Sequence, residues 1–174
     1  MKLVQFLQGG NPKGRKKSSF NTLKNILVLG IGNILMGDDG AGVFAVNKLS
    51  AKSRENEHLR FIDGGTLGLD LLNFVEWADI LIIIDAVDIG EFPGTIIKSI
   101  ITEDLNIKLS KTSHEIDIED LLFSAKLLNI LPEKIIFYGI QIGKITMQYS
   151  LSKDLEIKMD ELCNCIKNEL SNYL

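Results

Sequence analysis

Three residues that could carry chemistry stand in three separate connections of the chain. Asp39 lies in the turn GDDG, Asp85 follows the apolar run ILIII, and His114 precedes an expected helix. Two carboxylates and an imidazole form a borderline-to-hard ligand set that suits nickel, zinc, iron or manganese. Three protein ligands with open positions suit a catalytic metal, or a metal that another molecule carries. The sequence therefore predicts a metal-engaging site if the fold brings these residues together.

Each of these residues also has a structural interpretation. Of two adjacent acids in a turn before a helix, one can cap the helix and the other can favour its dipole, and capping is the role we expect for Asp38. Asp85 could be satisfied by loop amides, because buried carboxylates are usually hydrogen-bonded. A single loop histidine is more often structural than a ligand. Asp63, at the end of another expected strand, could join the set or replace one of its members.

Apolar runs alternate with helical patterns from residue 26 onward. This alternation predicts an α/β fold of three α/β/α layers around a twisted, mostly parallel five-stranded sheet. The run 80–86 is the most hydrophobic and should be the central strand, whereas 94–100 follows too short a link for a helical crossover and should pair antiparallel at an edge. The other expected strands are 26–31, 59–62 and 134–140, and the expected helices are 40–50, 67–77, 118–129 and 153–173.

The expected sheet decides where the candidate residues meet. In open α/β sheets, ligands bind outside the carboxyl ends of the strands. Asp39 and His114 precede expected helices, and Asp85 lies at the end of the expected strand 80–86. We therefore predict that the three residues gather at one edge of the sheet.

Composition and charge limit the classes of function. The chain has 174 residues, 45% of them hydrophobic and 24% charged, which predicts one globular domain. Residues 1–25 hold six bases and no acid, so the total net charge of −4 leaves −10 on residues 26–174. We expect a flexible basic N-terminal extension over 1–25 and an α/β domain over 26–174. An acidic domain argues against nucleic acid as the partner.

The sequence predicts a cytoplasmic protein without membrane insertion. No apolar run approaches the roughly 20 residues that span a bilayer. The apolar stretch 3–7 is too short for the core of a signal peptide. Cys163 and Cys165 would point about 200° apart on the expected last helix, which makes them poor partners for one disulfide or one metal.

Other catalytic motifs are weak or incomplete. Gly30 and Gly32 open a Gly-x-Gly turn after the first strand, but Leu35 stands where a dinucleotide fingerprint has its third glycine. The chain has no Gly-x-Ser-x-Gly nucleophile motif. The pair His114-Glu115 does not extend to a zinc-protease motif, because position 118 is isoleucine.

Five segments of the chain carry a family resemblance. They are, in order, ILVLGIGNILMGDDGAGVFAV, FIDGGTLGLDLL, LIIIDAVD, SHEIDIEDLLFSAKLL and IIFYGIQIG. They closely resemble the hydrogenase maturation endopeptidases, and the resemblance covers about residues 26–170. That family removes a C-terminal extension from the large subunit of nickel-iron hydrogenases.

The resemblance implies both a reaction and its residues. It implies an endopeptidase, aspartyl-type or metal-dependent, that recognises nickel already placed in a hydrogenase large-subunit precursor and needs no tightly bound cofactor of its own. By motif position, the family's metal-recognising residues fall on Asp39, Asp85 and His114, the trio that the sheet-edge argument selects. Asp38 is a further catalytic candidate. A substrate-facing Gly-Gly-Thr loop falls on Gly64, Gly65 and Thr66.

The sequence differs from the family's usual pattern in two places, and it leaves other functions open. The basic extension is not part of the family's usual pattern, and Gln141 is followed by Ile142 where many members have a proline. One rival is a nickel-sensing chaperone of the precursor that cuts nothing, since no activated nucleophile is visible. The others are a nucleotide- or flavin-dependent enzyme, which Leu35 disfavours, and a self-contained metalloprotease that would bind metal without substrate.

Overall fold

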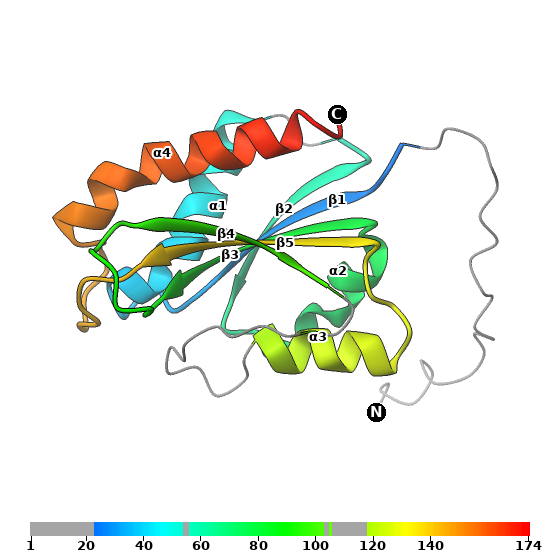
Figure 1. Cartoon of the computed structure of the whole chain (residues 1–174), viewed down its shortest axis with the longest axis horizontal. Coiled ribbons are helices and arrows are strands. Elements are labelled where there is room, and N and C mark those ends of the chain that lie inside the picture. Colours follow the sequence, from blue (N-terminus) through cyan, green and yellow to red (C-terminus); the bar gives the residue numbers. More distant parts are fainter. Residues whose placement is uncertain (1–22, 54–55, 103–104, 106–117) are drawn as a thin grey trace, which may run out of the picture.

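Five strands form one mixed sheet in the order β2-β1-β3-β5-β4 (Figure 1). The structure is a computed structural model that describes residues 23–53, 56–102, 105 and 118–174. The strands are β1 (Ile26–Ile31), β2 (Leu59–Gly65), β3 (Ile80–Val87), β4 (Ile96–Ile101) and β5 (Lys134–Gln141). The helices are α1 (Ala41–Lys52), α2 (Leu72–Trp77), α3 (Ile118–Leu127) and α4 (Lys153–Leu170), with short 3₁₀ turns η1 (Asp38–Gly40) and η2 (Gly68–Leu71).

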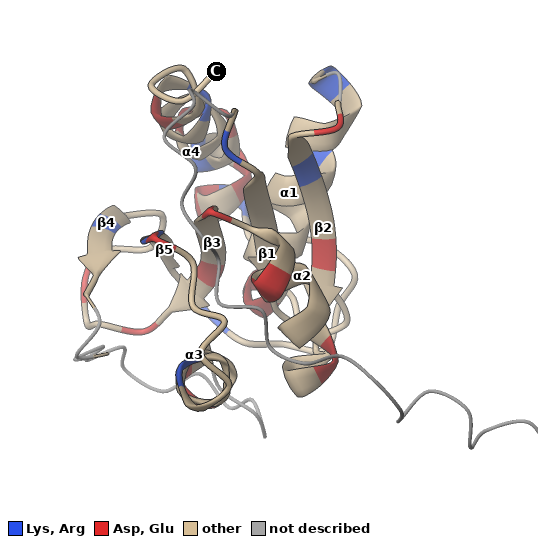
Figure 2. Ribbon diagram, turned by 90° about the vertical axis from the view of Figure 1, so that its right-hand side faces the viewer, with Lys and Arg blue, Asp and Glu red and all other residues tan. Residues whose placement is uncertain are grey.

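Helices cover both faces of the sheet, which confirms the predicted three layers. α1 and α4 pack on one face, where their apolar side chains meet those of the sheet. α2 and α3 pack on the other face in a second core. Figure 2 shows α4 above the strands and α3 below them. All eight residues of β3 are buried, as expected for a central strand between two helical layers.

The pairing of the strands follows the sequence prediction closely. β1, β2, β3 and β5 run parallel, and β4 pairs antiparallel with β5 at the edge. Some boundaries differ: β2 continues to Gly65, β4 starts at Ile96, and the expected helix 67–77 divides into η2 and α2. α4 ends at Leu170, three residues before the expected end. Most of the expected extension 1–25 lies outside the described residues.

A buried carboxylate fastens α4 to the edge of the sheet. Glu169 is 7% exposed and accepts hydrogen bonds from Lys98 of β4, from the hydroxyl of Tyr138 in β5 and from that of Tyr173. Burial opposes ionisation of Glu169, but the hydrogen bonds from Lys98 and Tyr173 outweigh it and lower the pKa of this carboxyl. The interaction holds the last helix over β4 and β5.

Close backbone contact joins the start of α1 to two strands. A Cβ on Gly42 would lie 2.2 Å from the carbonyl oxygen of Ile84 in β3 and 2.3 Å from that of Ile31 in β1. Only glycine permits this approach. The contact places the turn that precedes α1 directly at the ends of β1 and β3.

Among the described residues, no helix is both long and apolar enough to cross a membrane.

Replacing Gly42 with alanine tests this contact. The added methyl group would collide with backbone atoms that cannot rotate away, so we expect the unfolding free energy to fall by about 2 kcal/mol or more. This loss would appear despite the ~1 kcal/mol that alanine gains over glycine inside a helix. Urea denaturation measures the change, with the exposed Ala51→Ser in the same helix as a control. Equal stability of Gly42→Ala and the native protein would contradict the account.

Candidate functional site

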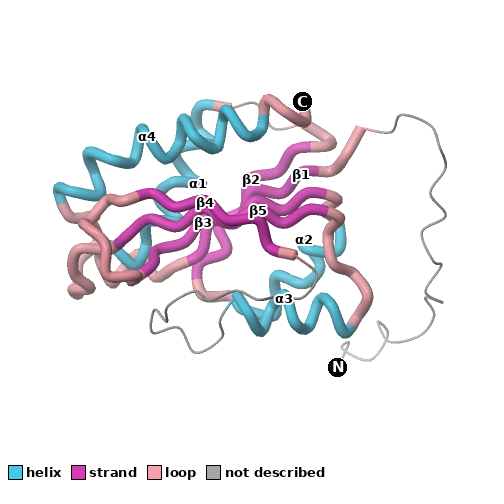
Figure 3. Tube along the Cα trace, in the orientation of Figure 1, coloured by secondary structure: helices cyan, strands magenta, loops and turns pink. Residues whose placement is uncertain are grey.

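The loops that follow β1, β3 and β5 gather at one end of the sheet, beside the start of α4 (Figure 3). Parallel pairing aligns these ends, because Gly30 pairs with Ile84 and Asp85 with Gly139. The end of β2 joins them, since the N–H of Gly32 donates to the carbonyl of Gly65, the last residue of β2, at 3.0 Å. The carboxyl ends of the parallel strands therefore form one surface, as the sequence predicts.

Asp39 is buried in η1 and held by the loop that precedes it. Its side chain is 2% exposed, and Oδ2 accepts a hydrogen bond from the N–H of Asn33 at 2.9 Å. Gly32 has φ +130°, and a Cβ there would lie 1.9 Å from the carbonyl oxygen of Asp39. The backbone around Asp39 is therefore fixed by a contact that only glycine at position 32 allows.

Asp85 lies inside β3, near its carboxyl end. It is 6% exposed, and Oδ1 accepts a hydrogen bond from the N–H of Ala86 at 2.8 Å. η1 packs against β3, and Gly42 touches the carbonyl of Ile84, the residue before Asp85. The structure thus brings Asp39 and Asp85 to the same end of the sheet, each with a carboxylate oriented by a backbone N–H.

The other predicted site residues have different outcomes. His114 lies outside the described residues. Asp63 is exposed at the end of β2, where Oδ2 accepts a hydrogen bond from Asn47 at 3.4 Å. Gly64 and Gly65 end β2, buried and half-buried, and only Thr66 of the predicted loop lies beyond the strand, where it is exposed. In the described part of the chain, no group of three or more histidine, cysteine or acidic residues is placed to hold a metal ion.

Asp38 does not cap α1, and that expectation is wrong. The N-cap of α1 is Gly40, which has no side-chain cap. Asp38 is fully buried, and its carboxylate instead accepts the N–H groups of Gly143 at 3.0 Å, Lys144 at 3.3 Å and Ser152 at 2.6 Å. These donors lie 105 to 114 residues away in the sequence, in the loop between β5 and α4. Asp38 therefore anchors that loop to η1.

Gln141 is a positioning residue that the sequence analysis did not recognise. Its side chain is 3% exposed, and Oε1 accepts the N–H groups of Ile89 at 2.8 Å and Glu91 at 3.3 Å. Nε2 donates to Asp88 and to the carbonyl of Ile142. The amide thus fixes the loop that follows Asp85. A polar residue that ends a strand of buried apolar residues was the available signal.

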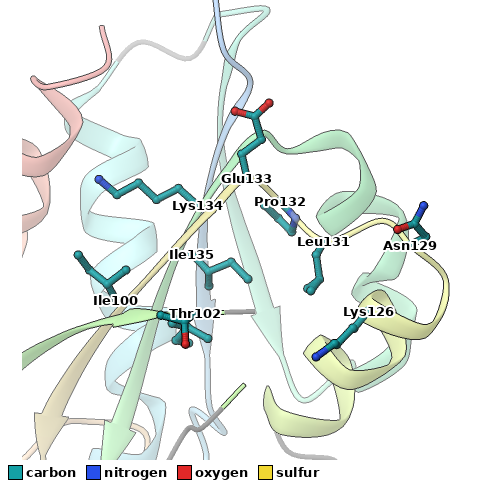
Figure 4. A pocket seen from close by; sticks show the side chains of 10 residues that line it. Ile100, Thr102, Lys126, Asn129, Leu131, Pro132, Glu133, Lys134 and Ile135 are labelled. Atoms are coloured by element: carbon teal, nitrogen blue, oxygen red, sulfur yellow. The ribbon is translucent and has the colours of Figure 1, made fainter. Parts of the chain in front are cut away.

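A hollow of about 760 Å³ lies at the opposite end of the sheet (Figure 4). It is bounded by the end of β4, the start of β5 and the segment after α3, with Lys126, Glu133 and Lys134 on its walls. None of the predicted site residues that the structure describes lines this hollow. Its position separates it from the end of the sheet that carries Asp39 and Asp85.

Comparison of the chain with known proteins identifies the class of protein that has this fold and carries two acidic residues at the end of its sheet. The family model described as hydrogenase maturation protease matches residues 43–169. The chain belongs to the hydrogenase maturation protease family. The matched range contains Asp85 and position 114, and it begins after Asp38 and Asp39.

Individual relatives agree with this assignment. Over 124 residues, 37% are identical to hydrogenase expression/formation protein HoxM of Azotobacter vinelandii, covering 69% of this chain and 59% of the relative. Hydrogenase 2 maturation protease of Escherichia coli K12 is 34% identical over 117 residues, 66% of this chain and 71% of that protein. The chain therefore spans less than two thirds of the length of the HoxM relative.

A solved structure shows the same architecture. Hydrogenase maturating endopeptidase HybD from E. coli matches with a TM-score of 0.76 and 27% sequence identity. The match covers 85% of this chain and 93% of HybD.

Removing the Asp38 carboxylate tests the anchor between η1 and the loop after β5. In Asp38→Ala, three N–H groups lose their acceptor, and we expect the unfolding free energy to fall by about 2–4 kcal/mol. Amide hydrogen exchange should accelerate at Gly143, Lys144 and Ser152. Asp160→Ala, which removes an exposed carboxylate on α4, should have a smaller effect on stability and none on these amides. Unchanged amide hydrogen exchange at these three residues in Asp38→Ala would contradict the role of Asp38 as an anchor of the loop.

Proposed function

We propose that the protein is an endopeptidase that removes the C-terminal extension of a nickel-iron hydrogenase large-subunit precursor after nickel insertion. One observation carries this proposal. This chain is a member of the hydrogenase maturation protease family, and it has two buried carboxylates, Asp39 and Asp85, at the carboxyl end of its parallel strands. That end of the sheet is where ligands of such folds bind.

In this proposal, nickel arrives as part of the substrate and serves as the recognition signal. Asp39, Asp85 and His114 engage the metal that the precursor carries, because carboxylates and imidazole suit nickel. The Gly64-Gly65-Thr66 loop faces the substrate beside them. Such a ligand set gains affinity only when the precursor supplies the cation. Metal insertion therefore controls processing.

The cleavage step follows from the same placement. Nickel held by the precursor would polarise the scissile carbonyl, and a carboxylate would activate the attacking water. Backbone N–H groups orient both Asp39 and Asp85, which supports a fixed geometry at the reacting bond. Asp38 acts through the loop that it anchors, since its oxygens accept three backbone hydrogen bonds. The proposed partner is the precursor protein, and the proposed compartment is the cytoplasm.

Intact-mass measurement of the precursor tests the reaction. Nickel-loaded and nickel-free precursors are incubated separately with and without the protein. We expect loss of a C-terminal peptide only from the nickel-loaded form in the presence of the protein. Binding of the cognate precursor without any change in mass would overturn the peptidase and favour a chaperone. Cleavage of both forms would keep the peptidase and overturn the recognition of nickel.

Substitutions at the three residues test their assignment. Asp39→Asn, Asp85→Asn and His114→Ala should each slow processing by about 100-fold or more, since even residues that only support a metal's ligands cost 10–100-fold when replaced. Thermal denaturation should show folded proteins, because asparagine keeps an oxygen that can accept the N–H of Asn33 or Ala86. Asp160→Asn, with its side chain 70% exposed on α4, is the matched control. Normal processing by any of the three variants would remove that residue from the site.

A further inference from the structure

Large apolar side chains are exposed on the loops that surround the candidate site. Leu35 follows β1 and is 59% exposed, Phe92 follows β3 and is 83% exposed, and Met147 and Tyr149 follow β5 at 89% and 67%. We call these four residues the rim patch. They lie on the loops at the end of the sheet that carries Asp39 and Asp85.

Backbone hydrogen bonds bring the members of the rim patch together. The N–H of Gln148 donates to the carbonyl of Leu35 at 3.0 Å, and the N–H of Gly37 donates to the carbonyl of Gln148 at 3.0 Å. Met147 and Tyr149 flank Gln148 and therefore stand beside Leu35. The ring of Tyr149 meets Phe44 edge to face, with 5.9 Å between the ring centroids.

The loop that carries Phe92 meets the loop after β5 through Pro93, the next residue in the chain. A Cβ on Gly143 would lie 3.4 Å from the Cβ of Pro93 and 3.3 Å from Oδ2 of Asp38. The loop after β3 therefore lies against the start of the loop that carries Met147 and Tyr149. The rim patch thus extends across three loops that contact one another.

Buried polar side chains hold these loops in place. Asp38 accepts N–H groups from both ends of the loop 143–152, and Gln141 accepts two from the loop after β3. Docking onto loops that are already ordered loses little conformational entropy. Exposed apolar side chains that cluster on a soluble monomer often mark an interaction site.

The position and size of the rim patch indicate which kind of partner binds there. A partner on these loops would lie over the end of the sheet that holds Asp39 and Asp85. Four side chains cannot supply the ~1,600 Å² that a standard stable interface buries, so they fit a transient encounter better than a permanent dimer. A protease must engage its protein substrate and then release it.

We propose that the rim patch docks an apolar segment of the precursor next to the scissile bond, with Leu35 and Met147 as its main contacts. This inference rests on the proposed function, because it takes the precursor as the partner. The patch supplies ground-state binding away from the reacting atoms. Its loss should therefore raise KM and leave kcat nearly unchanged.

The test replaces Leu35 and Met147 together with serine. We expect Leu35→Ser/Met147→Ser to raise the KM for nickel-loaded precursor at least tenfold, with kcat within twofold of the native value. The matched control is Leu127→Ser/Leu128→Ser on the segment that ends α3, where the two leucines are 72% and 59% exposed. The control variant should process precursor with native KM.

Binding separates failure of this inference from failure of the proposed function. Precursor affinity is measured in an Asp85→Asn background, so the result does not depend on cleavage. At least tenfold weaker binding with the rim substitutions, and native binding with the control, would support the inference even if no cleavage occurs. Equal affinity with and without the rim substitutions would overturn it. A native dimer that becomes monomeric in Leu35→Ser/Met147→Ser, with precursor affinity unchanged, would also overturn it and assign the patch to a second copy of this chain.

Discussion

The candidate site depends on one backbone contact, where the start of α1 lies against the carboxyl ends of β1 and β3. Gly42 touches the carbonyl oxygens of Ile31 and Ile84, and any side chain at this position would push the helix away from both strands. Because η1 directly precedes α1, the same contact sets where Asp39 lies. A carboxylate from the turn and one from inside β3 can share one end of the sheet only while this contact holds.

Two buried polar side chains extend this order to the surrounding loops. Asp38 binds the loop between β5 and α4, and Gln141 binds the loop between β3 and β4. Each satisfies backbone donors that would otherwise need water or another partner. The loops around Asp39 and Asp85 are therefore held by internal hydrogen bonds, which suits the proposed recognition of one feature of a large protein substrate.

The sequence predicts the sheet better than it predicts the contacts at the sheet's end. Apolar runs mark the strands, and the short link after Asp85 correctly indicates an antiparallel edge strand. The same reasoning correctly placed Asp39 and Asp85 at one end of the sheet. It assigned Asp38 to the wrong partner. A capping rule considers only neighbouring N–H groups, whereas the N–H groups that Asp38 accepts are more than 100 residues away. The role of Gln141 was missed for the same reason, since the loop residues that it binds, Asp88, Ile89 and Glu91, come 50 to 53 residues earlier.

The central proposal is that the carboxylates at the end of the sheet recognise metal in the precursor, and a thermodynamic cycle tests it most directly. In a His114→Ala background that arrests cleavage, the affinities for nickel-loaded and nickel-free precursor are measured with and without Asp85→Asn. Direct recognition predicts that nickel strengthens binding at least tenfold more when Asp85 is present, a coupling of about 1.4 kcal/mol or more. An identical effect of nickel on both proteins would contradict the account.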